Sequence, residues 1–212
     1  MKKSLILTAC LAVLVCAALV AGGATEEPIP AYETFPKSLG FQYGEISGTG
    51  LSHHWANGTT SYQVAAGGIY VPYVSGDAMG FSFTDTTLDY TVGGEAQFRV
   101  FGDAFTNWLT GQLYLFAGLN HRGYIPLELV SEGYEDTSDP DRYLYVNAVH
   151  SPGSFTPVIG LGGGIGIELV FFNHFSIPIE LGYAVQWIPT SPSLAEQFRL
   201  SLIPQVGFRY RY

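Results

Sequence analysis

Apolar and polar residues alternate with a period of two over much of the chain, most clearly in residues 198–212. Successive side chains of a β-strand point to opposite faces, so this stretch predicts a strand with one apolar and one polar face. The same alternation recurs in residues 88–101, 109–119, 159–171 and 177–187. No stretch carries a helical period of useful length, so the sequence predicts an all-β chain.

Turn sequences and connection lengths indicate how many strands there are. Three shorter alternating stretches precede the clear ones, at residues 39–44, 51–56 and 61–71. The count is seven if residues 39–56 form one strand, and eight if the chain turns at Ser47–Gly50, a sequence typical of turns. Short and long connections alternate, with residues 121–155 the longest. Transmembrane barrels have an even strand number and this same alternation, so we expect a closed antiparallel transmembrane β-barrel of eight strands.

The first 24 residues differ from the rest. Lys2 and Lys3 precede an apolar run that ends in small residues, which is the pattern of a cleaved secretory signal peptide. The run is just short of the roughly 20 residues that a membrane-spanning helix needs, which disfavours a retained anchor. Residues 25–37 are acidic and rich in proline and are expected to form an extended periplasmic leader, and residues 38–212 the barrel domain.

Composition excludes several classes of function. After residue 24 the chain keeps all eighteen acidic residues and seven of the nine basic ones, a formal net charge of −11. This balance argues against a nucleic-acid partner, which requires clustered basic residues. Cys10 and Cys16 both lie in the signal, so the mature chain is expected to have no disulfide. Leu7–Cys10 resembles the recognition sequence of bacterial lipoproteins, so lipidation of Cys10 stays open as an alternative.

The two faces of the predicted strands differ in bulk and in charge. One face collects nearly all the large aliphatic and aromatic side chains, and the other collects glycines and charged residues. The interior of an eight-stranded barrel only just accommodates side chains, so we expect the small and charged face inside and the bulky face against lipid. The expected polar network of the interior consists of Asp89, Glu95, Arg99, Glu168, Glu180, Arg199, Arg209 and Arg211.

Buried charges require partners, because an unpaired charge in an apolar environment is very costly. Glu180 and Arg199 lie on adjacent predicted strands, and we expect them to pair. The inward glycines between Gly160 and Gly166 are expected to leave room for the inward rings of Tyr114 and Phe116 on the neighbouring strand.

The motifs that resemble binding or catalytic sites are explained better by structural roles. Gly160–Gly166 does not match a dinucleotide-binding motif and begins no helix. His53 and His54 are consecutive on a strand, so their side chains point to opposite faces and cannot bind one metal together. The acidic residues between Glu132 and Asp141 do not have calcium-loop spacing and are expected to lie in a solvated loop. We therefore expect no catalytic residue, no cofactor and no metal site.

The last strand ends in aromatic residues at alternate positions, Phe208, Tyr210 and Tyr212. With the signal and the alternating segments, these residues make the mature chain resemble the small eight-stranded bacterial outer-membrane barrels of the OmpX/OmpW kind. The resemblance implies an integral protein of the cell outer membrane, surrounded by outer-membrane lipid and inserted by the barrel-assembly machinery, with both termini periplasmic. It also implies a structural or surface-exposed role, or a narrow porin-like passage for a small hydrophobic ligand. Two alternatives remain open: a soluble secreted lipocalin-like ligand-binding barrel, and an outer-membrane barrel enzyme.

Overall fold

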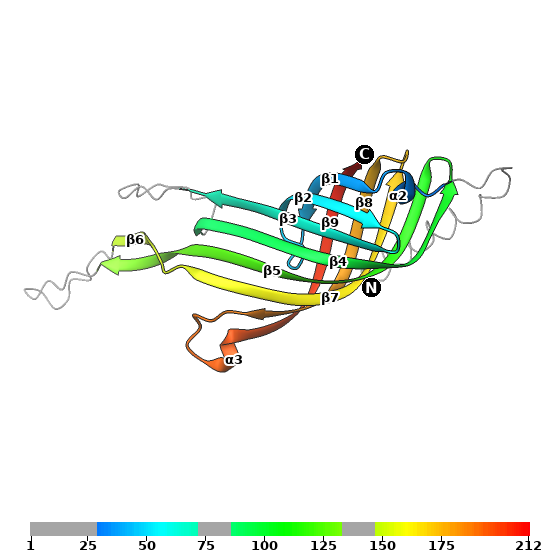
Figure 1. Ribbon diagram of the computed structural model, residues 1–212. Coiled ribbons are helices and arrows are strands. Elements are labelled where there is room, and N and C mark those ends of the chain that lie inside the picture. The colour runs from blue at the N-terminus through cyan, green and yellow to red at the C-terminus, as the bar shows by residue number, and fades with distance from the viewer. Residues whose placement is uncertain (1–28, 72–85, 133–146) are drawn as a thin grey trace, which may run out of the picture.

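The structure is a computed structural model that describes residues 29–71, 86–132 and 147–212 (Figure 1). Its elements in chain order are α2 (Ala31–Thr34), β1 (Lys37–Tyr43), β2 (Gly50–Asn57), β3 (Thr60–Tyr70), β4 (Thr86–Thr106), β5 (Leu109–Glu132), β6 (Asn147–Pro152), β7 (Thr156–Phe171), β8 (Phe175–Trp187), α3 (Leu194–Gln197) and β9 (Phe198–Arg211). The predicted signal peptide, leader residues 25–28 and most of the predicted acidic loop cluster lie outside the described residues.

Eight of the strands close into a ring in which every neighbouring pair is antiparallel. The sheet runs β4-β3-β2-β1-β9-β8-β7-β5, and a further pairing between β4 and β5 closes it. The last strand closes against the first, with Phe41 opposite Phe208 and Ser38 opposite Arg211. The predicted all-β class, the closed antiparallel barrel and the eight strands are therefore confirmed.

The two ends of the ring differ in the length of their connections. At one end, which we call the turn end, only two or three residues join β2 to β3, β4 to β5 and β7 to β8. At the opposite end, which we call the loop end, α3 lies in the connection between β8 and β9. Figure 1 shows the β8–β9 hairpin, with α3 at its tip, diverging from the long strands β4 and β5.

The prediction of a loop over residues 121–155 is wrong. β5 continues to Glu132, and β6 pairs with its last part, from Leu127 opposite Pro152 to Glu132 opposite Asn147. β6 pairs with no other strand of the described chain, so this two-stranded ribbon extends beyond the ring. The alternating pattern weakens in this stretch because the ribbon is no longer a wall with an inner and an outer face.

The connection between β1 and β2 also differs from its predicted form. Ser47–Gly50 was expected to be a turn between two strands, but Ile46, Ser47 and Gly48 are buried inside the ring. Gly48 has a φ of +93°, which favours glycine, and its backbone passes so close to Ala65 and Gly93 that a side chain would collide. We call residues 44–49 the plug, because they fold into the barrel instead of continuing its wall.

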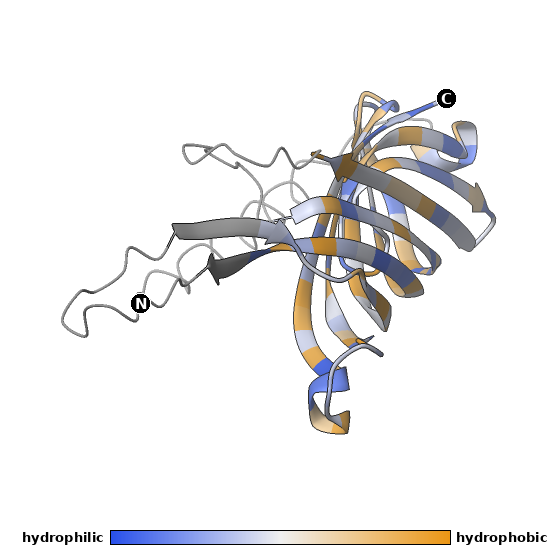
Figure 2. Ribbon diagram, turned by 90° about the vertical axis from the view of Figure 1, so that its left-hand side faces the viewer, coloured by the Kyte–Doolittle hydropathy of each residue, from blue (hydrophilic) through white to orange (hydrophobic). Residues whose placement is uncertain are grey.

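The polarity of the ring is reversed relative to a soluble barrel. Among the described side chains, the large apolar residues are mostly exposed on the outside, while glutamines, glutamates and arginines are buried inside. Figure 2 shows the resulting alternation of hydrophobic and hydrophilic residues along the strands. The outward apolar set includes Leu39, Phe41, Leu51, Val92, Leu115, Leu119, Leu161, Leu181, Tyr183, Leu200, Leu202, Val206 and Phe208.

Candidate functional site in the barrel interior

Glu168 of β7 holds two arginines of the last strand inside the turn-end half of the barrel. Its carboxylate accepts a hydrogen bond of 2.7 Å from Nη2 of Arg211, and Nη1 of Arg209 lies 3.5 Å from its other oxygen. Gln112 on β5 also donates a hydrogen bond to this carboxylate. All three charged side chains are completely buried, so their mutual pairing is what makes burial of the charges tolerable.

Glu180 of β8 is the centre of a second group, made of neutral donors. Its carboxylate accepts hydrogen bonds from Oη of Tyr114 at 2.7 Å and from Nε2 of Gln205 at 2.8 Å. Weaker bonds of 3.3 and 3.4 Å come from Nε2 of Gln97 and of Gln42. These donors come from four different strands, so one carboxylate connects β1, β4, β5 and β9 to β8.

Two amides link the Glu180 group to its neighbours. Gln97 donates from the same nitrogen to Glu95 at 2.6 Å, which places the Glu95 and Glu180 carboxyl groups beside each other. Oε1 of Gln42 accepts from Arg209 at 3.5 Å, and Gln63 on β3 accepts a further bond from the same guanidinium. The residues around Glu168 and the residues around Glu180 therefore form one continuous hydrogen-bonded network.

The plug is held by a single side chain of that network. Oε1 of Gln205 accepts hydrogen bonds from the backbone N–H of Ile46 at 2.8 Å and of Ser47 at 3.1 Å, and from the Ser47 hydroxyl at 3.3 Å. Because the amide nitrogen of Gln205 donates to Glu180, its oxygen is directed towards the plug. The charge of Glu180 thereby orients the group that binds the plug.

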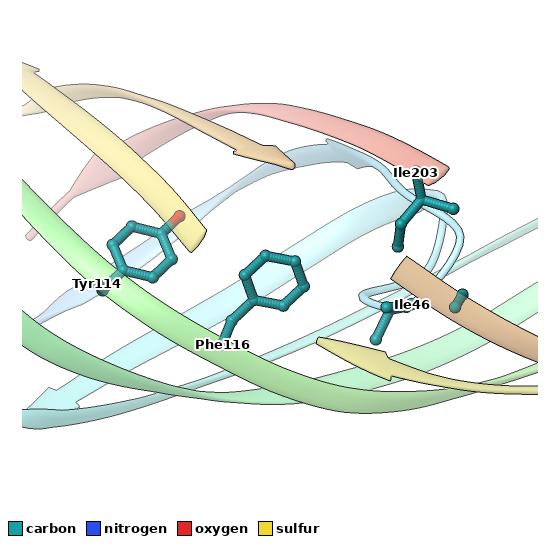
Figure 3. Close-up of a cluster of buried hydrophobic side chains, with 5 residues drawn as sticks. Ile46, Tyr114, Phe116 and Ile203 are labelled. Atoms are coloured by element: carbon teal, nitrogen blue, oxygen red, sulfur yellow. The ribbon is translucent and has the colours of Figure 1, made fainter. Parts of the chain in front are cut away.

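The plug also carries an apolar side chain into the lumen. Ile46 is completely buried and belongs to a cluster with Tyr114, Phe116, Ala184 and Ile203 (Figure 3). The glycines opposite these side chains provide the space, since a Cβ on Gly166 would overlap the Tyr114 ring and a Cβ on Gly162 would overlap Ile46. Tyr114 is paired with Gly166 and Phe116 with Gly164, so the two rings lie on the strand next to the inward glycines, as expected. The lumen is therefore filled at this level.

Beyond the plug, the loop-end half contains a cavity of about 580 Å³. Glu45 and Thr49 of the plug form part of its lining, and Gln186 donates to Glu45 at 2.9 Å. Asp89 and Arg122 form an ion pair of 2.5 Å on its wall, with their side chains 32% and 50% exposed. Asn120 donates to Thr91 at 2.8 Å. Arg199 lines the same cavity and is exposed.

The turn end is covered by the short helix α2, where an extended leader was expected. Ala31 and Tyr32 are buried there, and the Ala31 N–H donates to Oγ1 of Thr110 at 3.3 Å. The Arg99 guanidinium lies 4.0 Å from the centre of the Tyr32 ring and donates to the Gly58 carbonyl. Burial raises the pKa of Tyr32, and the charge of Arg99 opposes this. The leader thus contributes to closing the lumen.

The structure brings together some residues of the predicted network and separates others. Glu95, Glu168, Glu180, Arg209 and Arg211 are buried in one network. Arg99 lies at the turn end, while Asp89 and Arg199 line the cavity at the loop end.

The expected pairing of Glu180 with Arg199 is wrong. In the β8–β9 register, Gln186 lies opposite Arg199 and Gln205 lies opposite Glu180. Counting back from the hairpin between the two strands predicts this register, because Trp187 and Phe198 flank the connection.

Sequence reasoning missed the neutral residues that complete the network. Gln42, Gln63, Gln97 and Gln205 are all almost completely buried and all contact a charged member of it. The sequence did indicate their position, since each of these glutamines lies on the inward, polar face of its strand. They carry no formal charge, however, and were therefore not among the predicted members of the network.

The three aromatic residues of the last strand lie on the outside of the barrel near the turn end. Phe208 stacks on Phe175 with ring centres 5.9 Å apart, and Tyr210 stacks on His174 at 5.2 Å. Oη of Tyr212 lies 3.5 Å from Nε2 of His53. The last strand therefore takes part in a belt of aromatic contacts around the turn end.

The described residues offer neither a metal-binding cluster nor a membrane-spanning helix. No group of three or more His, Cys, Asp or Glu side chains in that part of the chain is arranged to hold a metal ion. None of its helices combines the length and the hydropathy needed to cross a membrane.

No protein-family model matches the chain, and no curated protein matches it. Among solved structures, the crystal structure of the N-terminal β-barrel domain of Pseudomonas aeruginosa OprF is similar over 83% of this chain and 95% of that one, with a sequence identity of 10% and a TM-score of 0.42. The class of the protein, a closed eight-stranded antiparallel barrel with a charged interior and an apolar exterior, rests on its own strand pairing and burial.

Proposed function

We propose that this chain is an integral outer-membrane β-barrel protein. The observation that carries the proposal is the reversed polarity of the ring, since residues such as Leu161, Leu181 and Leu200 are at least half exposed while Glu168 and Arg211 are completely buried. Apolar groups are stable on the outside only if the surroundings are apolar, and a closed ring satisfies its backbone hydrogen bonds without water. A soluble lipocalin-like barrel would need the opposite arrangement, so the same observation opposes that alternative.

The proposed orientation places the turn end in the periplasm. Outer-membrane barrels have short periplasmic turns and longer external loops, which matches the connections of this ring. Both termini of the barrel domain, near Lys37 and Tyr212, would then be periplasmic. Delivery through a cleaved signal peptide and insertion by the barrel-assembly machinery belong to the same proposal, and so does the kinship with the OmpX/OmpW kind.

We further propose a structural or surface-exposed role without a continuous pore and without catalysis. The support for a closed lumen is threefold: α2 at the turn end, the Glu168 and Glu180 networks, and the plug with the cluster around Ile46. The support against a rim enzyme is that the described residues lining the loop-end cavity include neither serine nor histidine.

A second candidate function is the binding of a small ligand from the loop end. The cavity of about 580 Å³ falls within the size range of small-molecule sites, and it combines apolar Ile69, Val158 and Ile188 with polar Asn120 and Gln186. A blind cavity favours binding over passage. The small hydrophobic ligand implied by the family resemblance would have to be accommodated by this mixed lining.

Detergent extraction with electrophoresis of boiled and unboiled samples tests the main proposal. We expect the protein to fractionate with outer membranes, to need detergent for release, and to migrate differently before and after boiling, because a closed barrel resists unfolding by the detergent. Release into the periplasm or medium without detergent would instead support the soluble barrel. Planar-bilayer recording tests the closed lumen: steady conductance by the purified protein would contradict it, while leaving the membrane assignment intact.

A further inference from the structure

The charges buried in the barrel interior do not balance. Among the described residues, the ionisable side chains that are at most 5% exposed, leaving aside tyrosines, are His54, Glu95, Glu168, Glu180, Arg209 and Arg211. Three carboxyl groups therefore accompany two guanidinium groups, which are always protonated. Because an uncompensated charge in such a site is strongly destabilising, the interior must take up one further positive charge.

Two of the three carboxyl groups have the surroundings of carboxylate ions. Glu168 lies between the guanidinium groups of Arg209 and Arg211. Glu180 accepts hydrogen bonds from three amide nitrogens and one phenol, which suits a carboxylate ion because such an ion only accepts. Together these two carboxylates balance the two arginines.

Glu95 has different surroundings. One of its oxygens accepts a hydrogen bond from Gln97, while the other receives none from any donor group in the described chain. Its carboxyl group lies beside that of Glu180, because the same Gln97 nitrogen donates to an oxygen of each. Two carboxyl groups can form a hydrogen bond only if one of them carries a proton, because a carboxylate ion only accepts.

Two other sources for the positive charge fit the structure less well. The ring of His54 is near Arg209 and Arg211, and neither of its nitrogens has a hydrogen-bond acceptor within the described residues. An imidazolium ion there would face two like charges, and the one carboxylate near it, Glu168, is already paired with both of those guanidinium groups. A metal cation would need several oxygen ligands, but the groups around Glu180 are N–H and O–H donors and only one oxygen of Glu95 is free.

We propose that Glu95 and Glu180 form a one-proton binding site in the lumen, in which protonated Glu95 donates a hydrogen bond to the Glu180 carboxylate. The ionisable groups that face Glu95 are Glu180 from β8, Tyr114 from β5 and Arg209 from β9. Glu168, Arg211 and His54 complete the buried set. The site makes the interior electrically neutral and adds a link between β4 and β8.

The proton gives the folded barrel a dependence on pH with a definite sign. In the unfolded chain a glutamate loses its proton near pH 4.3, whereas the proposed site still holds its proton at neutral pH. From about pH 4.3 up to the pH at which the folded site loses its proton, the folded state binds one proton more than the unfolded state. Raising the pH over this range therefore weakens folding. The effect is at most a tenfold change in the folding equilibrium constant for each pH unit.

The test is urea unfolding of the mature protein in detergent micelles at a series of pH values, comparing the wild type with Glu95→Gln. The amide of the variant is neutral at every pH, so the ratio of the two equilibrium constants should move in favour of the variant by up to tenfold per pH unit as the pH rises. Asp89→Asn is the matched control, and its folding equilibrium constant should change with pH in parallel with that of the wild type. Parallel curves for the wild type and Glu95→Gln would overturn the proposal.

Two further measurements keep the test decisive. If Glu95→Gln does not fold, the infrared C=O band of a protonated carboxylic acid in the wild-type protein at neutral pH is the readout, and its absence overturns the proposal. If the missing charge is a monovalent cation instead, wild-type stability at constant ionic strength should depend on whether sodium, potassium or choline is present. That dependence would overturn the proposal too, whereas equal stability in the three salts supports it.

Discussion

The turn-end and loop-end halves of the barrel are built from the same alternating strands, yet one is packed and the other contains a cavity. In the turn-end half all eight strands are present, and their inward side chains form a buried ionic network around Glu168 and Glu180. In the loop-end half, the Asp89–Arg122 pair is partly exposed and Arg199 is exposed. Position along the barrel axis, rather than the strand pattern, decides whether an inward charge is buried.

The difference arises from the length of β1 and β2. β1 ends at Tyr43 and β2 begins at Gly50, whereas β3 continues to Tyr70 and β9 begins at Phe198. Residues 67–70 of β3 and 198–205 of β9 therefore have one fewer strand neighbour than the rest of the ring. The residues between β1 and β2 form the plug instead of extending the wall, and the plug separates the packed half from the cavity.

The largest effect is expected from Glu168→Gln in the packed half. The substitution keeps the size of the side chain but leaves Arg209 and Arg211 without their common carboxylate. Breaking a buried pair by removing one partner costs about 3–5 kcal/mol. Urea unfolding in detergent micelles, followed by tryptophan fluorescence, should show a loss of this order. A loss below about 1 kcal/mol, the usual value of an exposed pair, would mean that the buried arginines do not depend on Glu168.

A somewhat smaller effect is expected from Gln205→Ala at the boundary between the halves. The variant removes the acceptor of three hydrogen bonds from Ile46 and Ser47, which weakens the inward position of the plug by about 1–3 kcal/mol. A Ser47→Cys background keeps the two backbone hydrogen bonds to Gln205. In it, thiol labelling of the folded protein should become faster by about tenfold or more, since each 1.4 kcal/mol corresponds to a factor of ten.

Gln186→Ala is the matched control for this experiment, because Gln186 also contacts the plug but on the exposed cavity side. It should leave the labelling rate nearly unchanged. Equal rates in both glutamine variants would show that the plug is not held by Gln205.

Substitutions at two glycines of β7 allow a direct comparison of the two halves. A Cβ on Gly166 would overlap the ring of buried Tyr114, whereas a Cβ on Gly160 would meet no atom closer than 3.5 Å. Gly166→Ala should destabilise the barrel by about 1–3 kcal/mol through overpacking. Gly160→Ala should be neutral or stabilise it by about 0.4–1 kcal/mol, because alanine restricts the unfolded chain. Equal unfolding midpoints for the two variants would contradict the contrast between a packed half and a cavity.

The sequence predicts the strands and their faces well because a period of two is a local property. β8 and β9 lie within two residues of their predicted bounds, and the residues expected inside, such as Glu180 and Arg209, are inside. The plug could not be predicted in this way, since Ser47–Gly50 has the composition of an ordinary turn. Its inward direction depends on Gln205 and on space beside Gly162, which come from distant parts of the chain.

The partners of the buried charges are equally non-local. Glu168 meets Arg211 across the lumen, and the two residues lie on strands that are not neighbours in the ring. Strand order and face place both side chains inside, but contact across the lumen also requires the tilt and the register of the whole ring. The sequence therefore predicts the members of the network better than their pairing.

The smallest effect is expected from Asp89→Asn in the cavity half. Its ion pair with Arg122 has good geometry, but both side chains are at least 32% exposed, so water and salt screen the interaction. Exposed pairs contribute about 0.2–1 kcal/mol, and the same urea titration should show a loss within that range, decreasing at high salt. A loss comparable to that of Glu168→Gln, and independent of salt, would mean that the loop-end half is as dry as the turn-end half.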